Sequence, residues 1–195
     1  MVIKGASSGG LVCCFRLLLI FDSAKIAPSC LAQYYGLSGL QSYPHPMLEV
    51  GRFCIDPAAY DGDILRLAWA ALSRYADHYK TQLLFGCASF SGLEPAPYRD
   101  VFALLNAGYL APRQWRPQVK APHVFRFEFR DTHRCDAGLA RRRLPLLLKT
   151  YLMMGGWVSD HAVVDHAMGM LHVFTGVELD SVPEARKWRL RAIAR

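Results

Sequence analysis

The stretch Met47–Ile55, MLEVGRFCI, places an acid, a glycine and a base inside a run of β-forming residues. Glu49 and Arg52 are three positions apart, so in an unbroken strand their side chains point to opposite faces. A β-bulge at Val50 and Gly51 would add one residue and bring both side chains onto one face. It would also leave backbone N–H groups unpaired. The pattern indicates either a site with a carboxylate, a guanidinium and free N–H donors, or a buried ion pair that fixes the strand.

The elements that must position these side chains alternate between strands and helices. In 61–80, apolar residues recur at helical spacing, with Asp61 or Asp63 as the N-cap, and in 123–130 three phenylalanines alternate with polar residues. We expect strands at 10–21, 47–55, 81–90, 123–130, 157–165 and 171–179, helices at 61–80, 96–108, 144–156 and 182–195, and a short helix or turn at 30–40. This mixture predicts an α/β or α+β layer fold.

The composition favours one globular domain. The chain has 195 residues, 52% of them hydrophobic and 20% charged, which is enough for a core and short for two domains. The longest apolar runs are interrupted by Arg16 and Lys149, so no membrane-spanning segment is predicted. The first ten residues hold one lysine and no clear cleavage site, so no signal peptide is expected.

Cysteine and histidine residues do not form a metal-binding pattern. The six cysteines include no C-x-x-C pair, and we interpret them as reduced thiols of a cytoplasmic protein. His161 and Asp165 would share one face of a strand, where a surface pair is expected, and their spacing is one residue short of the H-x4-D pair of glycerolipid acyltransferases. His166 and His172 lack the companions of a zinc site. No metal is predicted.

The net charge of +7 is unevenly distributed. The C-terminal stretch 184–195 holds five basic residues, and 126–149 holds seven basic against three acidic ones. Such a surface suits an acidic partner (nucleic acid, anionic lipid or an acidic protein), and the alternative is a solvated face. The seven basic residues are Arg126, Arg130, Arg134, Arg141, Arg142, Arg143 and Lys149.

Several motifs resemble, in order and spacing, a known family. They are FRLL at 15–18, EVGRFCI at 49–55, LLFGCASFSG at 83–92 and the long block at 144–165. The chain resembles the bacterial L-ornithine Nα-acyltransferases of ornithine-lipid synthesis, GNAT-like enzymes related to acyl-homoserine-lactone synthases. The resemblance implies a mixed, centrally splayed β-sheet flanked by helices in a single domain over 1–195 that lacks the N-terminal segment of the family. It also implies transfer of a 3-hydroxyacyl chain from acyl carrier protein to the α-amine of ornithine, which gives lyso-ornithine lipid.

The residues carried over from the resemblance fit this chemistry. Glu49 is expected to accept a proton from the amine, provided that burial raises its pKa, and N–H groups near Gly51 to stabilise the oxyanion. Arg52, or Arg16 on the neighbouring strand, is expected to bind the ornithine carboxylate. Ser89 either faces the acyl group or is a turn residue before Gly92. The pantetheine arm is expected between the strands at 47–55 and 81–90.

The expected donor is a carrier protein rather than coenzyme A. Where acetyl-CoA enzymes have a glycine-rich loop that binds the pyrophosphate, residues 56–65 contain three aspartates, which would repel it. No bound cofactor is expected, and acyl carrier protein docks on Arg141, Arg142 and Arg143 in this interpretation. The same arginines fit peripheral contact with an anionic membrane at the inner face of the cytoplasmic membrane.

Three alternatives remain at this point. The first is an acyl-homoserine-lactone synthase with S-adenosylmethionine as acceptor, against which FGCASF and GGWVSDHAVVD argue. The second is an inactive fragment that binds carrier protein or membrane. The third is a nucleic-acid-binding module, which charge alone suggests and which predicts a steep salt dependence of retention. We expect no nucleic-acid partner.

Overall fold

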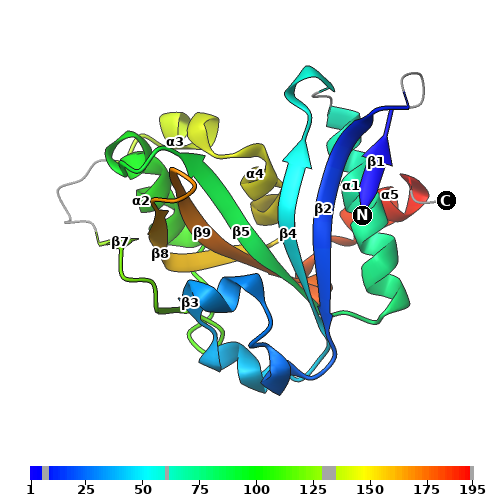
Figure 1. Ribbon diagram of the computed structural model, residues 1–195, viewed down its shortest axis with the longest axis horizontal. Coiled ribbons are helices and arrows are strands. Elements are labelled where there is room, and N and C mark those ends of the chain that lie inside the picture. The colour runs from blue at the N-terminus through cyan, green and yellow to red at the C-terminus, as the bar shows by residue number, and fades with distance from the viewer. Residues whose placement is uncertain (6–8, 60–61, 129–134, 194–195) are drawn as a thin grey trace.

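A seven-stranded mixed sheet forms the centre of the molecule (Figure 1). The computed structural model describes residues 1–5, 9–59, 62–128 and 135–193. The order of strands in the sheet is β1-β2-β4-β5-β9-β8-β7. The bounds are β1 Val2–Lys4, β2 Leu11–Ile20, β4 Met47–Ile55, β5 Leu83–Ser91, β7 Val124–Arg126, β8 Trp157–Asp165 and β9 Met170–Glu178.

The two central strands run parallel, whereas their neighbours in the sheet are antiparallel. β4 pairs in parallel with β5, and the pairs β1–β2, β2–β4, β5–β9, β8–β9 and β7–β8 are antiparallel. A parallel pair needs a crossover connection, which helix α1 (Gly62–His78) provides. The mixed sheet confirms the GNAT-like α/β architecture that the sequence predicts.

Helices cover one face of this sheet. The buried stripe of α1 contains Leu65, Ala68 and Leu72, which pack against Phe15 of β2 and Leu48 of β4. The helix thus presents the apolar face that its periodicity predicts, Asp63 lies in its first turn, and Asp61 lies outside the described residues. The other helices are α2 Arg99–Gly108, α3 Ala137–Arg143, α4 Leu146–Met153 and α5 Glu184–Ile193.

An irregular segment covers the opposite face. Residues 22–45 form three 3-10 turns, and the two-residue strand β3 (Tyr35–Gly36) pairs with β6 (Gln118–Val119). Buried residues of this segment, among them Tyr35 and Leu40, share a core cluster with Phe85 of β5 and Phe174 of β9. The short helix expected at 30–40 is found as the 3-10 turn Cys30–Gln33, whereas the β3–β6 pair has no counterpart in the sequence expectations.

The strand expected at 123–130 is wrong in length. β7 ends at Arg126, because its partner β8 changes register with β9 between Val158 and Ala162. Phe127 is still buried, stacked on Phe102 of α2 with ring centroids 4.8 Å apart. Phe129 and Arg130 lie outside the described residues.

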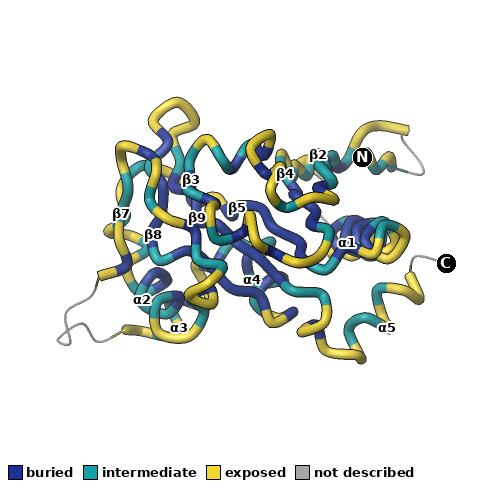
Figure 2. Tube along the Cα trace, turned by 90° about the horizontal axis from the view of Figure 1, so that it is seen from below, coloured by how far each residue is buried: buried dark blue, intermediate teal, exposed yellow. Residues whose placement is uncertain are grey.

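Two peripheral features complete the fold. α3 is a helix that the sequence expectations lack, and Asp136 begins it by accepting a hydrogen bond from the Leu139 N–H at 2.9 Å. α5 has no buried residue, whereas the strands β5, β8 and β9 are buried along most of their length (Figure 2). Among the described helices, none has the length and apolar character that crossing a membrane requires.

Candidate active site

The central strands β4 and β5 separate after a short stretch of pairing. Their register runs from Met47↔Leu83 to Val50↔Gly86 and then stops, although both strands continue. β4 remains paired to β2, and β5 remains paired to β9 up to Ser91. Beyond Val50 the facing edges of the two strands therefore make no ladder bonds with each other. Figure 1 shows the two strands diverging. This confirms the splayed centre that the resemblance implies.

Gly86 permits the close approach at the point of separation. A Cβ at this position would lie 2.5 Å from the Val50 carbonyl oxygen, closer than van der Waals contact allows. The hydroxyl of Tyr151, on α4, would lie 3.6 Å from that Cβ. Glycine is therefore required for the two backbones to meet before they diverge.

The predicted bulge exists at a different position. Arg16 pairs with Gly51 and Leu17 with Val50, so the ladder is regular where the sequence predicts the bulge. The register shifts between Cys14 and Arg16, which places Arg52 and Phe53 opposite a single residue of β2. Arg52 has a φ of 54°, in the left-handed region that a side chain rarely adopts. The bulge therefore lies one residue after Gly51, because Arg52 and not the glycine has the positive φ.

A cleft of about 420 Å³ lies between the separated strands and is lined by residues from both faces of the sheet. Glu49 and Arg52 both line it, as the sequence interpretation requires. The side covered by the irregular segment also contributes Arg16, Cys30, Leu31, Tyr34 and Tyr35, and the helical side contributes Phe53, Pro145, Leu147 and Tyr151. Polar and charged groups thus gather at one end and apolar groups at the other.

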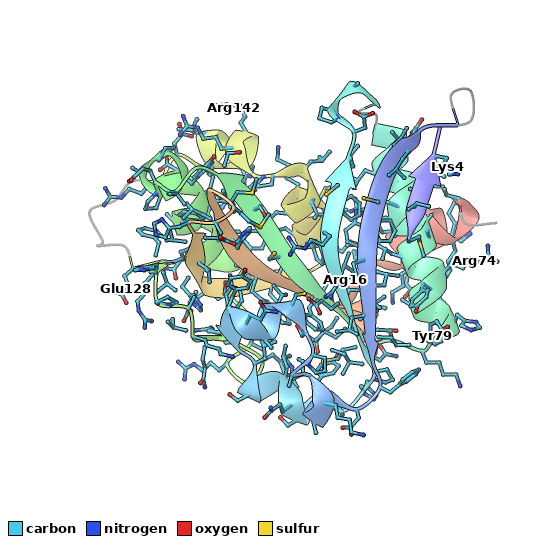
Figure 3. The ribbon with its side chains drawn as sticks, viewed as in Figure 1. Lys4, Arg16, Arg74, Tyr79, Glu128 and Arg142 are labelled. Atoms are coloured by element: carbon cyan, nitrogen blue, oxygen red, sulfur yellow. The ribbon has the colours of Figure 1, made fainter. Side chains whose placement is uncertain are left out.

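The main charged pair of the cleft joins Arg16 to Glu49. Nη2 of Arg16 lies 3.2 Å from Oε2 of Glu49, and the Cys30 N–H donates to the same oxygen at 3.2 Å. The Glu49 side chain is 1% exposed, whereas the Arg16 side chain, labelled in Figure 3, is 41% exposed, so only the arginine of this pair reaches solvent. Nε of Arg16 has no hydrogen-bond partner within the described chain. Arg16, and not Arg52, is therefore the partner of Glu49, while the guanidinium of Arg52 lies 3.8 Å from the Met168 sulfur.

Ser89 belongs to a hydrogen-bonded chain of side chains across three strands. Its hydroxyl lies 2.9 Å from Nδ1 of His172 on β9, and Nε2 of His172 lies 3.3 Å from a carboxylate oxygen of Asp165 on β8. All three residues line the cleft. Ser89 is thus a strand residue that faces the site, and the turn interpretation is wrong.

The expected surface pair of His161 and Asp165 is wrong. His161 is fully buried and its Nδ1 contacts Asp160 at 2.7 Å, whereas Asp165 contacts His172. The two residues are four positions apart in β8, about 13 Å along the strand, which is too far for a direct contact between their side chains. Cys87, Tyr151, Asp165 and His172 are among the cleft residues that sequence reasoning missed, because its patterns link neighbours along the chain and these residues meet across strands.

Burial keeps the Cys87 thiol of the cleft neutral. It raises the pKa of the Cys87 thiol to about 12, with the Glu49 charge adding to the effect. All six cysteines are free, and no group of His, Cys, Asp and Glu in the described residues has the arrangement of a metal site.

The unfolding free energy is expected to decrease as the pH falls below about 6.5. Burial lowers the pKa of both His161 and His172, so the unfolded chain binds more protons in this range. Stability is then full above the unfolded pKa and is lost as the pH falls toward the folded values, by up to about 1.4 kcal/mol per pH unit for each histidine. Urea unfolding at pH 7.5 and 5.5 measures this. His161→Gln should reduce the difference in unfolding free energy between the two pH values. The control His45→Gln, at an exposed position, should leave that difference unchanged. Equal stability of the unsubstituted protein at both pH values would contradict the lowered pKa of the two histidines.

The three arginines expected to dock a carrier protein lie beside the apolar end of the cleft. Arg141, Arg142 and Arg143 are exposed in the last turn of α3 (Figure 3 labels Arg142). Arg143 donates to the Pro97 carbonyl, and Pro145, two residues further on, lines the cleft. The structure therefore places a basic surface next to the cleft.

Comparisons with known proteins are consistent with this geometry. Residues 1–70 match the model of the acetyltransferase (GNAT) domain. The chain is 29% identical to an L-ornithine N(alpha)-acyltransferase of Rhodobacter capsulatus, over 90% of the chain and 67% of the relative. It is 29% identical to the enzyme of that name from Brucella abortus, over 70% of the chain and 48% of the relative, and 26% identical to that from Agrobacterium fabrum, over 92% and 62%.

The chain spans about half to two thirds of the length of these relatives. No solved structure matches it significantly. The central strands of the sheet run parallel and then separate. The domain match and the similar proteins both point to the same kind of acyltransferase fold. Residues 1–70 thus resemble a GNAT domain, and most of the chain is similar to L-ornithine N(alpha)-acyltransferases of several bacteria.

Proposed function

We propose that the protein transfers a 3-hydroxyacyl chain from acyl carrier protein to the α-amine of L-ornithine, forming lyso-ornithine lipid. The observation that carries the proposal is the Arg16–Glu49 pair at the point where β4 and β5 separate. An α-amino acid presents a carboxylate and an ammonium group on one carbon. A guanidinium beside a carboxylate presents the complementary charges.

The acceptor is held by the charged end of the cleft. Nε of Arg16 makes no hydrogen bond within the described residues and the side chain is 41% exposed, which suits two hydrogen bonds from the guanidinium to the carboxylate of ornithine. Glu49 lies directly behind it and accepts a proton from the ammonium group. Arg52, whose side chain lines the same cleft, adds positive charge near the reacting carbonyl.

The donor occupies the gap between the strands. A pantetheine arm carries amide groups, and the facing edges of β4 and β5 have no ladder bonds to each other beyond Val50. The arm can therefore take the place of a strand partner. Backbone N–H groups around the Arg52 irregularity stabilise the oxyanion that forms when nitrogen attacks the thioester.

The acyl chain and the carrier protein lie toward the helical side. A groove of about 530 Å³ shares Phe53, Pro145 and Leu147 with the cleft, and Ile55, Pro57, Leu65 and Leu146 line the rest of it. Every lining residue is apolar, which suits a hydrocarbon chain. Arg141, Arg142 and Arg143 beside it suit the acidic surface of a carrier protein.

Product analysis tests the proposal. The purified chain is incubated with a 3-hydroxyacyl carrier protein and equal concentrations of ornithine and S-adenosylmethionine, and the products are identified by mass spectrometry. We expect Nα-acylornithine. Acyl-homoserine lactone as the main product would favour the synthase alternative, and absence of any transfer would favour a chain that only binds its partners.

Replacing Arg16 by glutamine is expected to raise the KM for ornithine by about 10- to 100-fold, because a hydrogen bond to a charged group contributes about 1.5–3 kcal/mol. The preference for ornithine over 1,4-diaminobutane, which lacks the carboxylate, should disappear in the same variant. Steady-state kinetics with both amines measure this. Arg74→Gln, at an exposed position of α1, is the control (Figure 3); an unchanged preference in Arg16→Gln would exclude the carboxylate contact.

A further inference from the structure

The cleft contains an acid–base chain in addition to the Arg16–Glu49 pair. Ser89, His172 and Asp165 lie on one face of the adjacent strands β5, β9 and β8, joined by contacts of 2.9 Å and 3.3 Å. Asp165 is held by the Met168 N–H at 3.0 Å, and the backbone carbonyl of His172 accepts a hydrogen bond from Tyr35 at 2.7 Å. The imidazole is buried and the Ser89 side is open to the cleft.

The charges of Asp165 and His172 decide which of the three side chains donates each hydrogen bond. Burial alone would raise the pKa of Asp165, but the Met168 N–H and His172 outweigh it and lower the pKa. Burial lowers the pKa of His172 more than Asp165 raises it. An ionised Asp165 only accepts hydrogen bonds, so Nε2 of a neutral His172 carries the hydrogen. Nδ1 then has a free lone pair, and the Ser89 hydroxyl donates to it.

In the aminolysis of a thioester, the attacking nitrogen loses a proton and the departing sulfur gains one. In the proposed function, Glu49 removes the first proton from the ammonium group of ornithine. The nitrogen still carries a second proton that must leave after the C–N bond forms. The sulfur, in turn, leaves most readily as a thiol. A side chain that accepts the proton from the nitrogen and then donates a proton to the sulfur would serve both needs.

We infer that the Ser89 hydroxyl and His172, oriented by Asp165, carry this second proton from the attacking nitrogen to the departing sulfur. The inference rests on the proposed function. The amine nitrogen attacks the thioester carbon, its N–H proton passes to the Ser89 oxygen, and the Ser89 proton passes to Nδ1 of His172. When the C–S bond breaks, the sulfur takes the proton from Ser89, and His172 returns its own to the serine. The amide and the thiol are the products, Ser89 and His172 end as they began, and Glu49 releases the first proton to solvent.

The surroundings of His172 suit a temporary proton. The carboxylate of Asp165 on β8 stabilises the imidazolium form of His172, and the positive charge of Arg52 on β4 destabilises it. Tyr34 contributes an aromatic ring 6.4 Å away, and Ser89 is the hydrogen-bond partner at Nδ1. The imidazole therefore accepts a proton without retaining it. Asp165 is a positioning residue, since it acts through His172.

Variation of the leaving group tests the inference. Transfer to ornithine is measured with two donors that carry the same acyl group, one a thioester of pantetheine and the other of thiophenol, whose thiolate leaves without a proton. Ser89→Ala is expected to lower kcat by about 10²-fold with the pantetheine donor and much less with the thiophenol donor. Asp165→Asn should show the same pattern. Ser91→Ala, an exposed serine two residues further along β5, is the matched control.

Equal losses with both donors, or none, would overturn the inference, and so would an acyl group found on Ser89 by mass spectrometry, which would make the serine a nucleophile. Nitrogen-15 NMR of the imidazole provides a readout without ornithine: we expect a neutral Nε2–H tautomer whose Nδ1 signal moves in Ser89→Ala. An Nδ1–H tautomer would also overturn the inference. Failure of the proposed function has a different signature, because the unsubstituted protein would then acylate no ornithine with either donor.

Discussion

Replacing Glu49 by glutamine is expected to lower the kcat for acyl transfer to ornithine by about 10²- to 10⁴-fold, the usual contribution of a general base. Glutamine keeps the size of the side chain and can still accept a hydrogen bond from the Cys30 N–H. It has no basic oxygen for the proton of the ammonium group. The loss should therefore appear in kcat, measured at saturating ornithine, with the unfolding free energy in urea measured in parallel.

A matched control separates this effect from a general change of charge. Glu128→Gln makes the same substitution at an exposed position at the far end of the sheet (Figure 3). It should leave kcat within experimental error. If folded Glu49→Gln retained the full kcat, Glu49 would be a structural partner of Arg16 and the proton acceptor would have to be another group.

Replacing Gly86 by alanine is expected to decrease both stability and activity. The added Cβ would lie 2.5 Å from the Val50 carbonyl oxygen, which is backbone and cannot rotate away. Overpacking of this kind costs about 1–3 kcal/mol. The strands would have to move apart where their separation begins, so the KM for the acyl donor should rise as well. Urea unfolding and steady-state kinetics measure the two effects.

Gly108→Ala provides the comparison for Gly86. This glycine ends α2, has an ordinary φ, and a Cβ there would have no atom within 4 Å. The unfolding free energy should stay the same or rise by up to about 1 kcal/mol, because alanine favours a helix. A stability of Gly86→Ala equal to that of Gly108→Ala would show that the two strands do not touch as closely as the structure indicates.

Most of the fold is predictable from local patterns. The strands at 47–55 and 157–165 and the helix at 61–80 are found because their periodicity is carried by many residues. The expectation at 123–130 fails because pairing depends on β8, whose irregular register is encoded 30 residues away. The β3–β6 pair joins segments that are far apart in sequence, and each contributes only two residues.

The site is predictable in part. Glu49, Arg52, Arg16 and Ser89 line one cleft, as the motifs and the resemblance indicate. The position of the bulge is not predictable, because glycine is the residue that usually takes a positive φ and here Arg52 takes it. The contacts of His172 with Ser89 and Asp165 are set by strand order, which no motif along the chain records.

A crystal structure with ornithine bound tests the central proposal most directly. We expect the ornithine carboxylate within hydrogen-bond distance of the Arg16 guanidinium and the α-amine about 2.6–3.2 Å from a Glu49 oxygen, in the cleft where β4 and β5 separate. Ornithine bound elsewhere, with the cleft unchanged at a concentration that saturates transfer, would contradict it.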